Sequence, residues 1–361
     1  MEPRIFVPGV GQYDNLGDII LRRQLIEWLK PLGRLHVYIG NAPPGYGPGL
    51  GLRSDDALYR SFPQWYVAGV RSALRGNTSY VFKPGEIQLT LVGMKEHLGM
   101  LPMLALVRAG GGTVARVGAG SRNFSRLPAS LMRPSIALSD LTVWRDGRTA
   151  GYLRGRVMPD LAFGEGGVDD TDASPTRDRL VVSMRSDRAL PGEEWIDAVR
   201  TFAARRGLRI TVVTQVLRDR ERSRQLGRLL GGSVLDWDGT DHSAQEQRLR
   251  GAYRETVLAV SDRLHVLVTA FTEGAVPIAL LVDRSDKIER HFRAAGIEGI
   301  GVPSEGLSRE RLDALLERAV GRRDDLQSAL VDARTALRLV RADLERLFEA
   351  EPTALSVASG A

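Results

Sequence analysis

Short apolar runs alternate with helical stretches along this sequence. Arg4 to Val10 is an apolar run that is closed by glycines, and helical spacing follows from Asn15 to Trp28. Further strand-like runs follow in the first half of the chain, at Leu35 to Ile39, Ser79 to Phe82 and Thr113 to Val117. Strands that alternate with helices bury their apolar faces in a sheet that the helices cover. The pattern therefore predicts an α/β fold.

The alternation starts again in the second half, where Leu180 to Trp237 has the order strand, helix, strand, helix, strand. Residues 164–176, between the halves, are polar and rich in glycine and proline, which is typical of a linker. A chain of 361 residues is also long enough for two cores. We therefore expect two facing, Rossmann-like α/β domains in residues 1–165 and 175–305, and a helical tail in residues 306–350.

The tail carries a narrow apolar seam. Its members alternate spacings of four and three residues, as expected for one helical face: Leu326, Leu330, Ala333, Leu337, Val340, Leu344 and Leu347. Such a stripe needs a surface that covers it. We expect the tail to pack back across the N-terminal domain, and a homodimer formed through this helix is the alternative.

The composition excludes several classes of protein. The absence of cysteine excludes Cys-ligated zinc, iron–sulfur clusters and thiol nucleophiles, and the histidines lack metal-ligand spacing, so we expect no metal. The longest apolar runs have about eight residues, whereas a membrane-spanning helix needs roughly 20. Only four of the 50 basic residues are lysines, and the arginines are dispersed among acids, which argues against a nucleic-acid partner.

We expect a cytoplasmic location. A peripheral contact with the inner face of a membrane is an alternative, and it would use exposed arginines of the tail, Arg322, Arg323, Arg338 and Arg341.

The densest group of chemically active residues is Ser261-Asp262-Arg263-Leu264-His265. Arg263 and His265 are two positions apart, so an extended stretch would project a fixed cation and a proton-transfer group to one side. Arg185 directly follows an apolar strand, at the end where open α/β sheets bind ligands. Lys287 comes shortly after another apolar strand and can line the same edge.

A second candidate, Asn15-Leu16-Gly17-Asp18, opens a predicted helix. Asn15 can cap this helix, Gly17 lets another group approach the backbone, and Asp18 lies at the positive end of the helix dipole. Spacing alone favours simple capping and a functional role equally.

These stretches resemble the polysaccharide pyruvyl transferase family. The resemblance lies, in the family's order, in NLGDIILRRQLIEWL from Asn15, VVSMR ending at Arg185, and SDRLHVLVTAFTEGAVPIALLVDRSDKI from Ser261. The last stretch is the most specific, because Arg-Leu-His is followed by a helix of small residues, a Gly-x-x-Pro turn, a strand, and then Asp and Lys. The chain departs from the family pattern at Lys83 to Glu86, where a glycine triplet is common.

The resemblance implies a GT-B-like fold and a bacterial enzyme of exopolysaccharide or cell-envelope biosynthesis. The enzyme would transfer the enolpyruvyl carbons of phosphoenolpyruvate to a sugar as a cyclic ketal and release phosphate. Phosphoenolpyruvate would be a co-substrate on the C-terminal domain, and no cofactor is implied. The acceptor, a sugar or a lipid-linked oligosaccharide, would lie on the N-terminal domain.

The resemblance also implies roles for the candidate residues. His265 and Asp18 would be catalytic, and the substrate-binding residues would be Arg185, Arg263, Asn15, Gly17, Leu264 and Lys287. A phosphate and a carboxylate on one small molecule suit two arginine forks. Two other interpretations stay open: a nucleotide-sugar-dependent GT-B glycosyltransferase, and a non-catalytic glycan-assembly binding protein.

Overall fold

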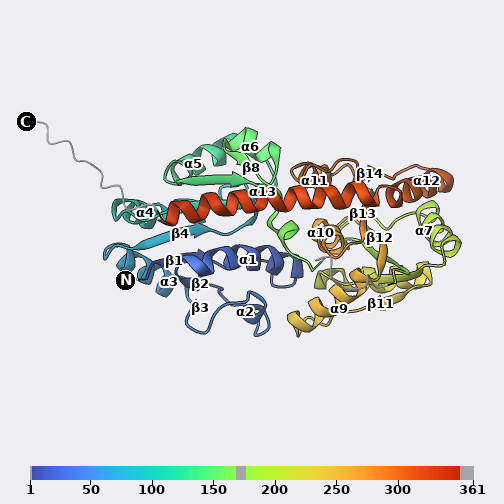
Figure 1. Ribbon diagram of the computed structural model, residues 1–361, viewed down its shortest axis with the longest axis horizontal. Coiled ribbons are helices and arrows are strands. Elements are labelled where there is room, and N and C mark those ends of the chain that lie inside the picture. Colours follow the sequence, from blue (N-terminus) through green and yellow to red (C-terminus); the bar gives the residue numbers. More distant parts are fainter. Residues whose placement is uncertain (1, 168–175, 350–361) are drawn as a thin grey trace, which may run out of the picture. The chain divides into compact units, whose positions relative to one another are not determined.

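The computed structural model describes residues 2–167 and 176–349 (Figure 1). Most of the expected linker, residues 168–175 of 164–176, lies outside these ranges. Within them, the chain forms two compact α/β units, each with its own parallel sheet, followed by a mostly helical tail. The predicted fold class is confirmed.

The first unit contains a parallel sheet with the strand order β3, β2, β1, β4, β6, β7, β8, and β5 also pairs with β6. The strand bounds are β1 Arg4–Pro8, β2 Arg34–Tyr38, β3 Ala57–Tyr59, β4 Thr78–Phe82, β5 Gly85–Ile87, β6 Val114–Ser121, β7 Leu141–Trp144 and β8 Arg156–Val157. The helices are α1 Leu16–Leu29, of which residues 21–29 belong to this unit, α2 Tyr46–Gly49, α3 Phe62–Ala73, α4 Met94–Ala109, α5 Arg126–Ala137 and α6 Gly147–Leu153. Every residue of β4 and β6 is buried, as expected for central strands that are covered on both faces.

The second unit contains a parallel sheet with the strand order β11, β10, β9, β12, β13, β14. These strands are β9 Arg179–Ser183, β10 Arg209–Val213, β11 Ser233–Leu235, β12 Thr256–Ser261, β13 Val276–Leu281 and β14 Gly301–Pro303. The helices are α7 Glu193–Arg205, α8 Arg220–Leu230, α9 His242–Arg254, α10 Leu264–Thr272, α11 Lys287–Arg293, α12 Arg309–Val320 and α13 Arg323–Glu349, of which residues 323–335 belong to this unit. The strand order reverses between β9 and β12, and ligands bind open α/β sheets at the carboxyl ends of the strands beside such a reversal.

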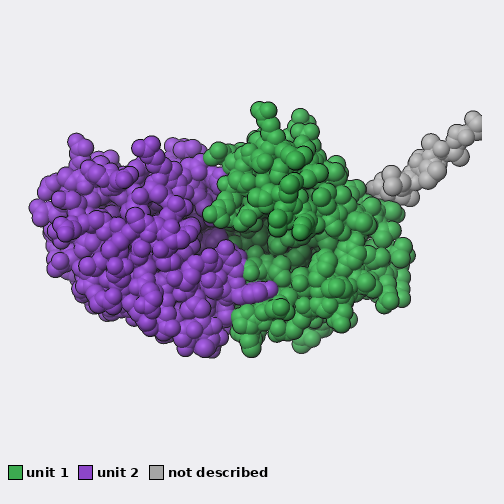
Figure 2. All heavy atoms as spheres, turned by 180° about the vertical axis from the view of Figure 1, so that it is seen from behind, with its two compact units in different colours: residues 1–11, 21–161, 336–361 green, residues 12–20, 162–335 purple. Residues whose placement is uncertain are grey.

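The units divide the chain differently from the domain boundaries that we expected. The second unit consists of residues 12–20 and 162–335, and the first contains residues 1–11, 21–161 and the end of the chain from 336 (Figure 2). Residues 12–20 belong to the second unit because their backbone pairs with it. The Leu16 N–H donates to the Gln215 carbonyl at 3.2 Å, and the Leu217 N–H donates to the Asp14 carbonyl at 2.8 Å.

The tail forms α12 and α13, with a break at Gly321. Six seam residues are buried, with exposures of 0 to 8%: Leu326, Leu330, Ala333, Leu337, Val340 and Leu344. Within the first unit, Thr113 Oγ1 donates to the Leu347 carbonyl at 3.1 Å, and Arg156 pairs with Asp343 at 2.6 Å. The chain itself therefore covers this part of the seam, which is not free to form the alternative coiled coil. In the described part of the chain, no helix has the length and apolar character that crossing a bilayer requires.

Candidate functional site

The candidate site starts at the reversal in the second sheet, where β9 and β12 lie side by side and Ser183 pairs with Ser261. The Ser261 hydroxyl donates to the Ser183 carbonyl and accepts the Arg263 N–H at 3.0 Å. The chain therefore leaves both strands in fixed directions, and it carries Arg185 away from β9 and Arg263 away from β12. Both predicted arginines lie at one sheet edge.

Asp262 connects the two strand ends. Its Oδ1 accepts the backbone N–H of Arg185 at 2.8 Å. Burial raises the pKa of the Asp262 carboxyl to about 6, although that N–H and the positive charges of Arg263 and Arg185 oppose the shift. The guanidinium of Arg185 bonds the Asp187 carboxylate through Nε at 2.8 Å and Nη2 at 2.6 Å, and these bonds hold the pKa of Asp187 well below its usual range.

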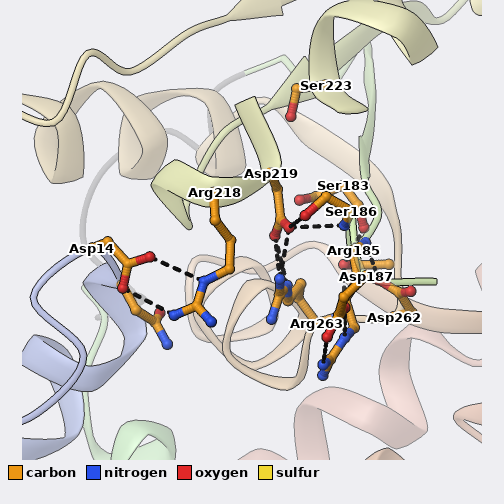
Figure 3. A network of polar contacts seen from close by, with 12 residues as sticks. Asp14, Ser183, Arg185, Ser186, Asp187, Arg218, Asp219, Ser223, Asp262 and Arg263 are labelled. Carbon is orange, nitrogen blue, oxygen red and sulfur yellow. Dashed lines mark hydrogen bonds and ion pairs between the residues drawn. The ribbon is translucent and has the colours of Figure 1, made fainter. Parts of the chain in front are cut away.

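Asp219 connects the carboxyl end of a third strand, β10, to the ends of β9 and β12. It follows β10, its side chain is 2% exposed, and it accepts hydrogen bonds from Arg263 Nε and Nη2, each at 2.7 Å. The same carboxylate accepts the N–H and the hydroxyl of Ser186, both at 2.9 Å (Figure 3). The loops after β9, β10 and β12 therefore meet at one buried carboxylate, which fixes the direction of the Arg263 guanidinium.

The segment 12–20 brings the second candidate motif to this sheet. Asn15 forms an antiparallel bridge with Val216. The guanidinium of Arg218 contacts Asp14 through two hydrogen bonds of 3.0 Å (Figure 3). The Asn15 side chain accepts the N–H of Gly17 at 3.0 Å, as expected for a residue that caps α1.

Gly17 lies directly against His265. A Cβ atom on residue 17 would lie 2.4 Å from the Cβ of His265, so only glycine fits. Asp18 follows Gly17, and its Oδ2 accepts the N–H of Gln12 at 2.9 Å. The structure therefore brings Asn15, Gly17 and Asp18 to the same unit as His265, although we expected the first three in the N-terminal domain.

The expected extended stretch around Arg263 and His265 is wrong. Arg263 has the extended conformation of a residue that precedes a helix, and α10 begins at Leu264, so His265 is its second residue. The two side chains consequently lie on different neighbours, Arg263 on Asp219 and His265 on Gly17.

Leu264 and Lys287 lie at the margins of the site. Leu264 is 5% exposed and packs in the core of the unit, where it fixes the start of α10. Lys287 begins α11, after the loop that follows β13. That loop connects to the one after β9 through an ion pair of 2.9 Å between Asp283 and Arg188.

No role was assigned from the sequence to three polar residues of the site: Asp219, Asp262 and Ser186. Asp262 stands inside the motif that was recognised, and Ser186 directly follows Arg185. For Asp219 the sequence offers one indication. Like Arg185, this residue comes after an apolar strand. No group of three or more acidic or histidine side chains in the described residues could hold a metal ion.

Solved structures with the same architecture define the class of this chain. A putative UDP-N-acetylglucosamine 2-epimerase from Listeria monocytogenes has a TM-score of 0.58 at 13% identity, with 98% of each chain covered. The glycotransferase of kitacinnamycin has a TM-score of 0.54 at 10% identity, covering 96% of this chain and all of its own. The Methanocaldococcus jannaschii UDP-GlcNAc 2-epimerase has a TM-score of 0.51 at 12% identity, covering 94% of this chain and 99% of its own. At such identities the likeness concerns the fold, which is GT-B-like.

The family assignment comes from the sequence. The model of the polysaccharide pyruvyl transferase family matches residues 15–284, which include the Asn15 motif, Arg185 and the Arg263 to His265 motif. The chain belongs to this family, and the predicted resemblance is confirmed. No curated protein matches the sequence.

Proposed function

We propose that this protein transfers the enolpyruvyl carbons of phosphoenolpyruvate to a sugar hydroxyl pair, forms a cyclic ketal and releases phosphate. The observation that carries the proposal is the placement of Arg185 and Arg263 on the two strands beside the reversal of the sheet, in the unit that also holds His265. Phosphoenolpyruvate has a phosphate and a carboxylate on three carbons, and each anion can take one guanidinium.

The two arginines are held differently. In the described residues, Arg263 bonds the buried Asp219 through Nε and Nη2, and its Nη1 remains for a ligand. Arg185 bonds Asp187, whose side chain is 53% exposed. An arriving anion can replace Asp187, because this exposed carboxylate regains water when it leaves the guanidinium. We therefore assign Arg263 as the fixed anchor and Arg185 as the exchangeable one.

The proposed reaction uses His265 as the acid and Asp18 as the base. A proton from His265 adds to the methylene carbon while a sugar hydroxyl adds to the neighbouring carbon and gives its proton to Asp18. The bond from that carbon to the phosphate oxygen then breaks, and its electron pair leaves with the phosphate beside Arg185 and Arg263. A second hydroxyl of the same sugar then adds to this carbon and closes the ketal. The proton of this second hydroxyl leaves with the phosphate. No cofactor takes part.

The test is acceptor-dependent release of phosphate from phosphoenolpyruvate. Arg263→Ala and His265→Ala should reduce turnover to the background. Circular dichroism should show both variants folded, although Arg263→Ala loses stability because it leaves the buried Asp219 without its cation. Arg209→Ala is the matched control, because Arg209 pairs with Asp178 at the opposite end of the sheet and is 60% exposed. Near-normal turnover by either site variant would overturn the residue assignment.

A thermal-shift comparison separates this proposal from a nucleotide-sugar glycosyltransferase. A ligand that binds only the folded state raises the unfolding temperature. Phosphoenolpyruvate should raise it, and Arg263→Ala should remove that rise. A rise with UDP-sugars alone would favour the alternative.

A further inference from the structure

The first unit carries exposed apolar side chains on two neighbouring loops. Leu91 and Val92, in the loop between β5 and α4, are 60% and 73% exposed, and Leu127, in the first turn of α5, is 60% exposed. We call these three side chains the apolar tip. Single exposed apolar residues are ordinary, whereas a group on adjacent loops marks an interaction surface.

The two loops are braced together. The Leu89 N–H donates to Asn123 Oδ1 and Asn123 Nδ2 donates to the Leu89 carbonyl, both at 2.8 Å. The Arg122 N–H donates to the Ile87 carbonyl at 2.9 Å. Leu89 and Met94, on either side of the exposed pair, are fully buried. The fold therefore holds the apolar tip outward, and its exposure does not result from a loop without contacts.

Four exposed cations lie on the segments that carry the apolar tip or beside them: Lys95, Arg122, Arg126 and Arg148. The guanidinium of Arg148 lies 4.3 Å from the ring centroid of Phe124, which places it above the second loop. Glu86 is a nearby acid, and its contact with Arg122 is long, at 3.6 Å. The surface thus combines protruding apolar groups with excess positive charge, the composition that binds an anionic bilayer interface.

The tail arginines are less suited to this role. Arg322 donates to the Glu298 carbonyl at 2.7 Å, Arg323 to the Gly274 carbonyl at 2.9 Å, and Arg341 pairs with Glu345 at 2.7 Å. These three cations are therefore engaged within the chain, which makes the expected membrane contact through the tail a poorer candidate than the loops of the first unit.

We propose that the apolar tip and its cations dock the first unit on an anionic lipid bilayer. Leu91, Val92 and Leu127 enter the interface, and Lys95, Arg122 and Arg126 contact lipid phosphates. The loops follow the carboxyl ends of strands β5 and β6, so docking brings this edge of the first sheet to the lipid surface. The proposal stands on this surface alone and does not depend on the reaction proposed above.

The experiment is co-sedimentation of the full chain with vesicles of phosphatidylcholine, with and without phosphatidylglycerol. The wild type should bind the vesicles that contain phosphatidylglycerol, and salt should weaken the binding. Leu91→Asp with Val92→Asp should lower the partition coefficient at least about tenfold. Arg122→Gln with Arg126→Gln should lower it about tenfold or more, and only for the anionic vesicles.

Leu339→Asp is the matched control, because Leu339 is 65% exposed on α13 in the same unit. This variant should bind vesicles as the wild type does, and thermal unfolding should show that all variants are folded. Equal binding to both kinds of vesicle, or wild-type binding by the Leu91 and Val92 variant, would overturn the proposal. A change from dimer to monomer in that variant, without vesicle binding by either protein, would also overturn it, because the surface would then bind a second copy.

Discussion

At the scale of single residues, Asp262 is subject to opposing effects. Burial raises its pKa from 3.8 to about 6, while the N–H of Arg185 and two guanidinium charges favour the carboxylate. Because the folded-state pKa lies above the unfolded one, the folded protein binds this proton more tightly. The contribution of Asp262 to the free energy of unfolding is thus fully present below about pH 4 and is lost as the pH rises through about 6.

Asp262→Asn should remove this pH dependence, because the amide oxygen still accepts the N–H of Arg185 but carries no charge. The free energy of unfolding of the variant relative to the wild type should rise by about 2 kcal/mol between pH 4 and pH 7. Urea unfolding of both proteins at the two pH values measures the difference. A difference that does not change with pH would contradict the prediction.

Two buried arginines of the first unit should respond to substitution with opposite signs. Arg116 is 1% exposed, its guanidinium lies 3.6 Å from the ring centroid of Phe82, and burial lowers its pKa to about 9. Arg145 instead pairs with the buried Asp160 at 2.8 Å. Arg116→Met should leave stability unchanged or raise it by about 1 to 2 kcal/mol, because it removes the desolvation of a charge.

Arg145→Met should lower stability by about 3 to 5 kcal/mol, because it leaves the Asp160 carboxylate buried without its cation. Chemical denaturation of the two variants side by side checks the contrast. Destabilisation by both substitutions to the same extent would show that Arg116 makes a stronger contribution than its contacts explain.

At the scale of elements, the start of α1 and the start of α10 meet at Gly17 and His265. Gly17→Ala would place a methyl group 2.4 Å from the His265 Cβ, so one of the two helix starts must shift. We expect a loss of about 1 to 3 kcal/mol in stability. If the proposed function holds, turnover should fall at least about tenfold, because a small misplacement of a catalytic group is costly.

Gly251→Ala in α9 is the control for that substitution. An added Cβ at residue 251 meets no atom within 4 Å, so this change should raise stability by up to about 1 kcal/mol through helix propensity alone. Turnover should stay at the wild-type level. Equal effects of the two substitutions would contradict a specific contact at Gly17.

The elements themselves could be predicted where the signal is local. The carboxyl end of β9 follows from an apolar run, which placed Arg185 at a sheet edge. The pattern before Ser261 did not identify the strand β12, so the position of Arg263 at the same edge was not predicted. The role of Asp219 could not be predicted, because its partners Ser186 and Arg263 are 33 and 44 positions away and no periodicity links them. Likewise, seam periodicity predicted a covered face of α13, but not the contact of its end with Thr113.

At the scale of the whole molecule, the helices α1 and α13 are each divided between the two units. Residues 16–20 and 21–29 of α1 belong to different units, and α13 divides in the same way between Thr335 and Ala336. Sequence periodicity identified both helices, yet the division between units depends on tertiary pairing such as that of Leu16 with Gln215. This is why a boundary drawn at the linker alone assigned residues 12–20 to the wrong unit.

Ala336→Pro should test whether the shared helix couples the units. Proline inside a helix removes a hydrogen bond and costs about 3 kcal/mol or more. We expect one calorimetric transition for the wild type and two for the variant, with Ala336→Ser as the control that keeps one transition. Two resolved transitions in the wild type would show that the units unfold independently.

The division of the chain between the two units also sets the order in which the units can fold during synthesis. The first unit needs residues from 336 on, while the second needs residues 12–20 and 162–335, all of which are made earlier. The first unit therefore cannot finish folding until all residues of the second have been made, unlike domains that fold one after another from the N-terminus. Without the residues from 336 on, the first unit lacks Leu337 and Leu344, which are buried in the full chain, so truncation before residue 336 should yield aggregating chains rather than a folded first unit.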